Sequence, residues 1–536
     1  MSMSLTAREE WMKIRRQAVT GRWGRPFAVL GAVAALALSA QAIAQTKFDR
    51  SRTVIFANGG VVATLDPMRT DYAQTSFIAS TLYDTLVTYD SSGKLVGQLA
   101  ETFELAKDAK SIDVRLRPGA VFHDGTPVTA NDVAYTLDRL KRLGLGIASQ
   151  IDGYDKTTVA DARTLTIHLS RPDSLFAGAL SKVYILEAKL AAANAGTDDA
   201  QGWLQSHDAG SGPYVFSGRR NADIVVSQFP GYWNKVAGRP EQIVFRRIDE
   251  GGTQRDELLA GNIDLAVLGM GYRDAALLDK GGRVKDAHLK PELQTNIIFN
   301  TRTGPTADAR VRRAIRLAYD YQGGLDAIRQ GAGVIANGPL PSTMSCRPDL
   351  PAAHRDVAEA KRLLAEAGVK NLQLTMRFQP TVEVQRLEAT LLQSNLAEIG
   401  VQLKLEPISF AAYLASVARF DTIPQMMLLD DFAQFPDPGA ILLRGYRSDA
   451  VGTNRGGYSN PKVDALLDAA KASSDAAKRC DLYKQVQVIL DQDSVIMPLY
   501  TVGRPAMYRP QQIQTPQVNK VVFPLAPADL RLATKP

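Results

Sequence analysis

The sequence has little cysteine and histidine, and neither residue is clustered. Among 536 residues there are two cysteines and five histidines. There is no H-E-x-x-H motif and no pair of cysteines at zinc-binding spacing. We therefore expect no metal site and no cofactor.

The motifs of common enzyme classes are also missing. There is no P-loop and no G-x-S-x-G sequence. Residues 331–336 have the form G-x-G-x-x-A, but a helical pattern rather than a strand precedes them, so a dinucleotide site is not indicated. Asp430 and Asp431 are adjacent, which places them poorly to flank one scissile bond. The sequence thus favours a protein that is not an enzyme.

The net charge is small for the length of the chain, and long apolar runs are few. The formal net charge is +7, of which the first 44 residues hold +4, so the remaining +3 is too small to indicate nucleic-acid binding. The apolar run Phe27–Leu38 is shorter than the roughly 20 residues that a membrane-spanning helix needs. It follows a basic region and precedes Ala42-Ile43-Ala44, a small-x-small sequence. We therefore predict that residues 1–44 are a signal peptide and that the mature protein is soluble and periplasmic.

The two cysteines, Cys346 and Cys480, would then lie in an oxidising compartment. Spacing alone does not establish disulfide geometry. A bridge and two buried thiols both stay open from the sequence.

A strand, a turn and a capped helix are predicted between Leu116 and Leu143. We expect a short strand over residues 120–123 and a tight turn at Asp124-Gly125. Thr129 and Asp132 have the spacing of a capping box. The helix that follows has an apolar stripe and should end at a glycine; these residues are Val133, Leu137, Leu140 and Gly144.

Several stretches together resemble one protein family. They are F-H-D-G-T-P-V-T-A-N-D-V at residues 122–133, T-L-D-P at 64–67, S-G-P-Y-V-F at 211–216 and Y-S-N-P-K-V-D-A-L-L at 458–467. These motifs resemble those of the extracytoplasmic solute-binding proteins of family 5, the peptide, nickel and opine receptors of ABC importers. The resemblance runs from about residue 54 to about residue 508. It implies an α/β, periplasmic binding protein-like fold with two lobes joined by two crossover strands and an extra small subdomain in lobe I.

The lobe boundaries follow from two segments that look like crossovers, residues 294–300 and 496–502. We predict that lobe I comprises residues 45–295 plus 498–536, with the small subdomain at about 90–208. Lobe II should comprise residues 296–497.

Candidate ligand-binding residues lie where predicted strands end. In open α/β sheets, ligands bind beyond the carboxyl ends of strands. Three predicted strands, within residues 263–268, 372–378 and 426–429, run into polar or aromatic turns. These turns contain Tyr272, Gln379, Gln434 and Phe435, and the resemblance adds the lobe I loop of Thr70, Asp71 and Tyr72.

Two of these positions differ in charge from dipeptide-binding members of the family. Where those proteins carry an aspartate for the ligand's amino group this chain aligns Gln434, and where they carry an arginine for the carboxylate it aligns Gln379. We therefore expect free dipeptides to bind poorly, and the ligand to be a polar molecule without a zwitterionic backbone, such as a sugar derivative, an opine-like conjugate or a capped peptide. An alignment shift would bring Asp430, Asp431 or Asp437 into the amine-binding role, so a peptide ligand stays open.

The resemblance implies a receptor that captures a small molecule or peptide between two closing lobes and delivers it to an inner-membrane ABC permease. We expect a monomer that does not bind nucleic acid. A periplasmic hydrolase or a chaperone-like protein on the same fold is the alternative, because fold does not determine function. Saturable binding without turnover would separate the two.

Overall fold

The computed structural model describes residues 48–60, 62–69, 73–289, 293–516 and 526–533. The chain divides into two compact units, Met1–Arg50 and Ser51–Pro536, and the fold below is that of the second. The predicted signal peptide and the predicted site residues Thr70, Asp71 and Tyr72 lie outside the described residues. Within the described ranges, no helix combines the length and the apolar character that crossing a bilayer requires.

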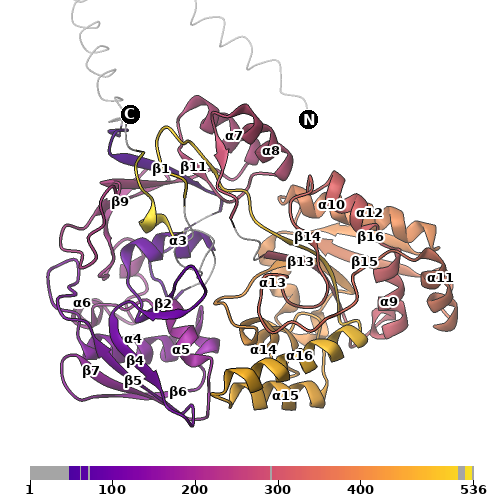
Figure 1. The fold of residues 1–536 in the computed structure, drawn as a ribbon, viewed down its shortest axis with the longest axis horizontal. Coiled ribbons are helices and arrows are strands. Elements are labelled where there is room, and N and C mark those ends of the chain that lie inside the picture. The colour runs from indigo at the N-terminus through magenta and orange to yellow at the C-terminus, as the bar shows by residue number, and fades with distance from the viewer. Residues whose placement is uncertain (1–47, 61, 70–72, 290–292, 517–525, 534–536) are drawn as a thin grey trace, which may run out of the picture. The chain divides into compact units, whose positions relative to one another are not determined.

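The largest sheet has seven strands in the order β12-β19-β11-β1-β10-β9-β8. At its centre β1 pairs in parallel with β10 and with β11 (Figure 1). The strand predicted at residues 263–268 is only the two-residue β11. The bounds are β1 Thr53–Asn58, β8 Tyr214–Arg220, β9 Asp223–Gln228, β10 Gln242–Arg247, β11 Leu265–Ala266, β12 Lys285–Asp286 and β19 Met507–Tyr508. The helices of the same stretches are α3 Ala73–Leu82, α7 Gly251–Ala260 and α8 Tyr272–Gly281.

A four-stranded antiparallel sheet, β4-β5-β7-β6, lies within the stretch predicted to be the small subdomain. Its strands are β4 Ala100–Leu105, β5 Ser111–Leu116, β6 Tyr154–Val159 and β7 Thr164–Leu169, and the hairpin β2 Val87–Tyr89 with β3 Leu95–Gly97 precedes them. The helices here are α4 Ala130–Leu143, α5 Phe176–Ala179 and α6 Ala188–Ala193.

The start and end of α4 match the sequence prediction, but the short strand before it does not. The Thr129 amide donates to Asp132 Oδ2 at 2.8 Å, and Gly144 ends the helix with φ 63°. The strand predicted over residues 120–123 is wrong, since only an isolated bridge joins Val121 to Pro127. The Phe122 amide bonds to the Thr126 carbonyl, so the chain turns back immediately.

The second large sheet has six strands in the order β14-β18-β13-β17-β15-β16. β13 lies between β17 and β18, antiparallel to both, and β15, α12 and β16 form a βαβ unit. Strand bounds are β13 Leu293–Phe299, β14 Val334–Ile335, β15 Gln373–Phe378, β16 Gln402–Pro407, β17 Met426–Asp431 and β18 Ile496–Val502. Helix bounds are α9 Ala309–Ala318, α10 Tyr321–Ala327, α11 Val357–Glu366, α12 Glu383–Glu398, α13 Phe410–Val417, α14 Gly439–Tyr446, α15 Pro461–Lys471 and α16 Ala476–Gln492.

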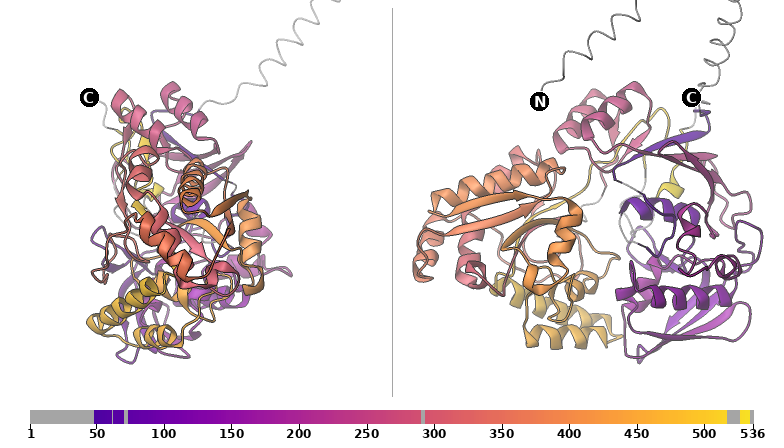
Figure 2. Two further views of the ribbon diagram at one scale, coloured as in Figure 1. Left: turned by 90° about the vertical axis from the view of Figure 1, so that its right-hand side faces the viewer. Right: turned by 180° about the vertical axis from the view of Figure 1, so that it is seen from behind.

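Two hydrophobic clusters cover opposite faces of this sheet. Helices α9, α11 and α12 pack on one face with Met426 and Leu428, and α13 packs on the other with Met427 and Leu429. Figure 2 shows these helices around the sheet from two further directions. The alternation along β17 is that expected for a strand buried on both faces.

Cys346 and Cys480 form a disulfide with a Cα–Cα distance of 4.9 Å. Of the two alternatives left open by the sequence, the bridge is the one observed. It ties the segment before α11 to α16 across 134 residues of sequence. Closing a loop of that length stabilises a fold by roughly 4–5 kcal/mol in the chain-entropy model. The predicted boundaries of lobes and subdomain stay predictions.

Candidate functional site

The last two residues of β17, Asp430 and Asp431, face opposite sides of the six-stranded sheet. Asp430 pairs in register with Thr295 and Asp431 with Gln294, on the neighbouring strand β13. Successive side chains of a strand point to opposite faces, so the two carboxylates meet different surroundings. This arrangement also keeps them from acting together on one bond.

The Asp430 face is closed by a buried ionic network. Thr295 Oγ1 donates to Asp430 Oδ1 at 2.6 Å and accepts from Arg329 Nη2 at 2.7 Å. The Arg329 guanidinium also contacts Glu388 Oε1 at 2.9 and 2.7 Å. The side chains of Arg329 and Glu388 are 3% and 0% exposed. Removing one member of a pair so deeply buried destabilises a protein strongly, because the other charge is left buried without a partner.

Burial shifts the acidity of this network. Burial raises the pKa of Glu388 to about 7, although the Arg329 charge opposes the shift. Burial alone would lower the pKa of Arg329, but Glu388 and the other negative partners outweigh it, and the net pKa is raised. Arg329 therefore stays charged.

Tyr272 joins the same network from α8. Its hydroxyl accepts from Arg329 Nη1 at 3.2 Å and donates to the Gly503 carbonyl at 3.2 Å. The guanidinium carbon lies 5.2 Å from the centroid of the Tyr272 ring. Burial raises the pKa of Tyr272, so the phenol remains protonated. The structure thus places one predicted site residue against a buried arginine.

Gln379 lies at the end of β15, near this network. Its backbone N–H donates to Gln385 Oε1 at 3.0 Å, and Gln385 Nε2 lies 3.5 Å from Asp430 Oδ2. Gln379 itself is half-buried. The structure therefore brings Tyr272 and Gln379 to the same group of residues, through Arg329 and Asp430.

Gln434 is buried, and its side-chain oxygen has no partner. The residue is 4% exposed, and among the residues that the structure describes no donor reaches Gln434 Oε1. Buried polar atoms are normally hydrogen-bonded, because an unsatisfied one costs about 1–3 kcal/mol. The role proposed for Gln434 below rests on this unsatisfied acceptor.

Phe435 packs into the protein core. It is 3% exposed, and its ring lies against α5, where a Cβ added at Gly178 would come within 3.0 Å of a ring carbon. Glycine at this position permits the close approach. The buried position leaves Phe435 little surface for contact with a solute.

Asp437, the third carboxylate of this region, accepts a hydrogen bond from the backbone. Its Oδ1 accepts the amide N–H of Gly439 at 2.8 Å, at the start of α14. Burial raises its pKa. The carboxylate therefore acts as a cap in this turn.

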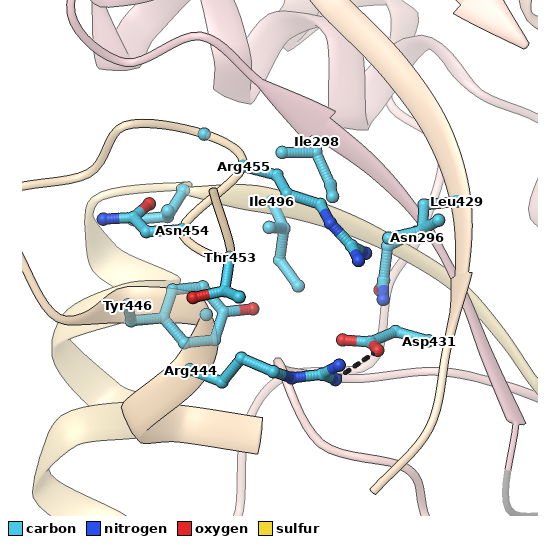
Figure 3. Close-up of a pocket in the computed structure, with 13 residues that line it drawn as sticks. Asn296, Ile298, Leu429, Asp431, Arg444, Tyr446, Thr453, Asn454, Arg455 and Ile496 are labelled. Carbon is cyan, nitrogen blue, oxygen red and sulfur yellow. Dashed lines mark hydrogen bonds and ion pairs between the residues drawn. The ribbon is translucent and has the colours of Figure 1, made fainter. Parts of the chain in front are cut away.

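A pocket lies on the Asp431 face (Figure 3). It is partly open to solvent and lies between β13, β17, α14 and the loop before Tyr458. The figure shows the guanidinium groups of Arg444 and Arg455 on either side of Asp431, with the Asn296 amide beside them. Apolar side chains complete the lining, namely Ile298, Leu429, Val495 and Ile496.

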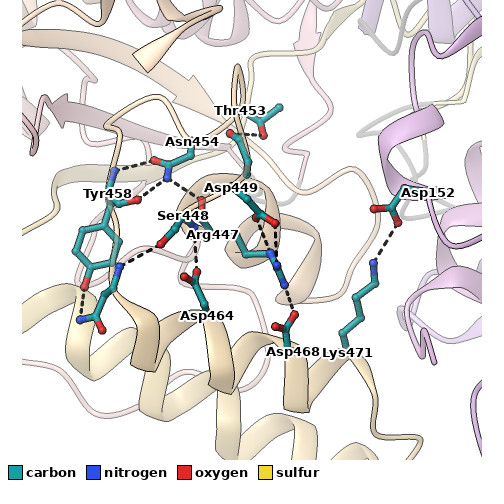
Figure 4. Close-up of polar contacts among 12 residues, drawn as sticks. Asp152, Arg447, Ser448, Asp449, Thr453, Asn454, Tyr458, Asp464, Asp468 and Lys471 are labelled. Carbon is teal, nitrogen blue, oxygen red and sulfur yellow. Dashed lines mark hydrogen bonds and ion pairs between the residues drawn. The ribbon is translucent and has the colours of Figure 1, made fainter. Parts of the chain in front are cut away.

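The loop that borders this pocket is held by its own polar contacts (Figure 4). Asn454 Nδ2 donates to the carbonyls of Arg447 and Tyr458 at 2.8 and 2.7 Å, and the Tyr458 amide donates back to Asn454 Oδ1. Arg447 forms ion pairs with Asp449 and Asp468. The loop thus presents the adjacent residues of the pocket from a fixed backbone.

The sequence interpretation missed Arg329, Glu388, Arg444 and Arg455. Glu388 is in line with Gln385, Ala389 and Leu392 on the buried stripe of α12, and a charge on a buried stripe is the signal that was available. Arg444 and Arg455 gave no local signal, since only the folded loop brings them together.

Comparison with known proteins decides the family. Residues 94–453 match the model of the bacterial extracellular solute-binding proteins, family 5. The chain belongs to this family. It is therefore a solute-binding receptor, and family 5 proteins are transport receptors rather than enzymes.

Two curated relatives are similar to this chain over most of its length. The probable D,D-dipeptide-binding periplasmic protein DdpA of Escherichia coli K12 is 29% identical over 456 residues, covering 82% of this chain and 86% of the relative. The glutathione-binding protein GsiB of Salmonella typhimurium is 26% identical over 499 residues, covering 90% and 93%.

Solved structures of the family share the fold. The Helicobacter pylori DppA in complex with the peptide STSA has a TM-score of 0.79 at 22% identity, covering 90% of this chain and 98% of that one. The binding protein AgaA in complex with agropinic acid, from A. tumefaciens R10, has a TM-score of 0.78 at 23% identity, covering 90% and 99%. These likenesses establish the α/β, two-lobe periplasmic binding protein fold.

Proposed function

We propose that this receptor is exported by the signal peptide of residues 1–44 and works in the periplasm as a monomer that delivers its solute to an inner-membrane ABC permease. The relative DdpA is named as a periplasmic protein, and the Helicobacter pylori structure as an ABC transporter-associated periplasmic binding protein. We also propose that it neither binds nucleic acid nor turns over its ligand. The small net charge and the missing catalytic motifs support both points.

The solute, we propose, is a peptide-like or opine-like molecule that lacks a free ammonium group at Gln434. The observation that carries this is the buried Gln434 Oε1, which no donor in the described part of the chain reaches. A neutral acceptor matches an amide N–H or hydroxyl donor. A buried ammonium group without a counter-charge would cost several kcal/mol, on the order of a thousandfold in affinity.

The other predicted site residues keep proposed roles in this picture. Tyr272 and Gln379 would contact the solute from the ends of two strands, and Thr70, Asp71 and Tyr72 would contact it from lobe I. Phe435 would support the turn that carries Gln434, since its ring packs on Gly178.

Calorimetry with matched peptides tests the proposal. We expect acetyl-Ala-Gln-amide to bind at least about tenfold more tightly than free Ala-Gln, because only the free dipeptide brings an ammonium group to a neutral acceptor. Micromolar binding of free Ala-Gln would contradict the assignment of Gln434.

A variant and a product assay complete the test. Gln434→Ala should weaken the capped peptide by about tenfold, the loss of one hydrogen bond in a dry site, with an unchanged melting temperature. Mass spectrometry of the ligand after overnight incubation should recover it intact. Cleaved peptide would favour the hydrolase alternative.

A further inference from the structure

The two larger sheets are joined by the chain at two places, and the elements around them touch again far from those connections. Among the described strands, the chain passes from the seven-stranded to the six-stranded sheet between β12 and β13 and returns between β18 and β19. The second contact joins residues 173–178, around α5, to residues 435–440, before and in α14, and to the end of α15 (Figure 1). Neighbours in the chain do not enforce this contact, so it depends on its own interactions.

Part of the contact is apolar. Phe435 and Ala440 belong to the same hydrophobic cluster as Leu175 and Phe176. Phe435 is 3% and Leu175 6% exposed, and a Cβ added at Gly439 would come within 2.8 Å of Leu175 Cδ1. Separating the two sides would expose these apolar side chains to water, which is unfavourable.

Polar groups join the same two sides. The Ser174 amide N–H donates to the Lys471 carbonyl at 2.8 Å, and Ser474 Oγ donates to the Lys107 carbonyl at 3.0 Å. Lys471 Nζ lies 3.1 Å from Asp173 Oδ2, and the Asp173 side chain is 1% exposed. A carboxylate buried to that extent depends on its charged partner rather than on water. The contact of residues 173–178 with residues 435–440, Lys471 and Ser474 is termed the latch.

The turn that carries Gln434 is part of this arrangement. Gln434 directly precedes Phe435 and is 4% exposed. Its neighbours on both sides, Ala433 and Phe435, pack against the hydrophobic cluster that contains Leu175. Separation of the latch is therefore the movement that uncovers this turn.

We infer that the latch is a gate, which opens to let the solute reach and leave Gln434 and which the Lys471–Asp173 pair helps to hold closed. The inference rests on the role proposed for Gln434. If the closed state predominates, a weaker latch raises the small open population without changing the affinity of the closed state. Association and dissociation should then become faster together.

Hydrogen exchange without any solute measures the opening itself. In Lys471→Met the Ser174 amide should exchange about tenfold faster than in the native protein, the effect expected for one largely buried ion pair. The Ser170 amide donates to the Gly153 carbonyl on its own side of the latch and should be unaffected. Lys484→Met, at a 45% exposed site on α16, is the control for net charge and should leave both amides unchanged. Unchanged exchange of Ser174 in Lys471→Met would overturn the latch.

Stopped-flow kinetics with acetyl-Ala-Gln-amide tests the gate. The association and dissociation rate constants of Lys471→Met should both rise about tenfold, while Kd stays within about twofold of the native value. A role of Lys471 in folding alone would not move the two rates together. A higher Kd with an unchanged association rate would place the latch in the bound state only and overturn the gate.

A second variant tests whether Asp173 is the partner through which Lys471 acts. Asp173→Asn should also speed exchange of the Ser174 amide, and the double variant should exchange no faster than Lys471→Met. Independent effects that multiply in the double variant would remove this pair from the latch.

Failure of the proposed function gives a different result. If acetyl-Ala-Gln-amide does not bind the native protein, the role proposed for Gln434 fails and the gate fails with it. If the peptide binds but exchange of the Ser174 amide is the same in Lys471→Met and the native protein, the gate fails and the role of Gln434 stands.

Discussion

The two faces of β17 use the same residue types for different purposes. On the Asp430 face, an arginine, a glutamate and a threonine are buried, and hydrogen bonds link them to one another and to the half-buried Asp430. On the Asp431 face, an aspartate and two arginines line a pocket that is partly open to solvent. Neighbouring carboxylates of one strand thus belong to a closed network and to an accessible one.

The difference teaches where a charged group contributes most to the stability of the fold. Removing one member of a buried pair strands the other without water or partner, so such residues are costly to change. A partly exposed pair loses little stability, because water replaces the lost partner. We therefore expect changes of charged residues to cost more stability on the Asp430 face than on the Asp431 face.

Breaking the closed network should have the largest effect. Arg329→Met removes the hydrogen bonds to Glu388, Thr295 and Tyr272, and should lower the free energy of unfolding by about 3–5 kcal/mol in urea titrations. Arg444→Met, the matched change on the open face, should cost about 1 kcal/mol or less. Equal losses for the two variants would remove the distinction between the faces.

The pH dependence of stability should report on Glu388. Its pKa is raised to about 7 from an ordinary 4.5, so its stabilising contribution is fully present below about pH 4.5 and is lost as the pH rises through about 7. The unfolding free energy of the native protein relative to Glu388→Gln should therefore fall by roughly 2–3 kcal/mol over this window. The comparison with the variant is needed because burial also raises the pKa of Glu187 to about 7.

A flat difference between these two proteins from pH 4.5 to 7.5 would show that Glu388 is ionised throughout. In that case the charge of Arg329 would lower the pKa of Glu388 by at least as much as burial raises it.

An ion pair with one buried and one partly exposed member should give a loss of stability between these two values. Lys471 Nζ contacts Asp173 Oδ2 at 3.1 Å and Asp152 Oδ1 at 3.3 Å, the latter shown in Figure 4. The Asp173 side chain is 1% exposed but that of Lys471 is 16% exposed. Lys471→Met should cost about 1–2 kcal/mol in urea unfolding.

Asp152→Asn is the control for this pair, because its 47% exposed carboxylate should contribute less than about 0.5 kcal/mol. A larger loss in Asp152→Asn than in Lys471→Met would argue against burial as the deciding factor.

Local signals in the sequence predicted elements well and their surroundings poorly. β18 matches the crossover segment predicted at residues 496–502, and the Thr129–Asp132 box lies at the start of α4, because strand patterns and capping depend on residues close in sequence. The strand at 120–123 failed since its backbone groups bond within a turn instead.

Long-range partners could not be read from the chain. Arg329 and Glu388 are 59 residues apart, and Cys346 and Cys480 are 134 apart, so their pairing depends on the complete sheet and its helices. The adjacent residues Asp430 and Asp431, both half-buried, gave no sign that one would bond to a buried threonine and arginine network and the other to a partly exposed arginine. That outcome depends on what packs on each face of β17.

The most direct measurement compares Arg329→Met and Gln434→Ala in one thermal melt, each with and without acetyl-Ala-Gln-amide. Arg329→Met should melt well below the native protein and still be stabilised by the peptide. Gln434→Ala should melt within about 2 °C of the native protein and gain little from the peptide, since a ligand raises stability only as far as it binds the folded state. A large loss of melting temperature in Gln434→Ala, or full stabilisation of it by the peptide, would contradict the division of roles between the buried network and the turn that carries Gln434.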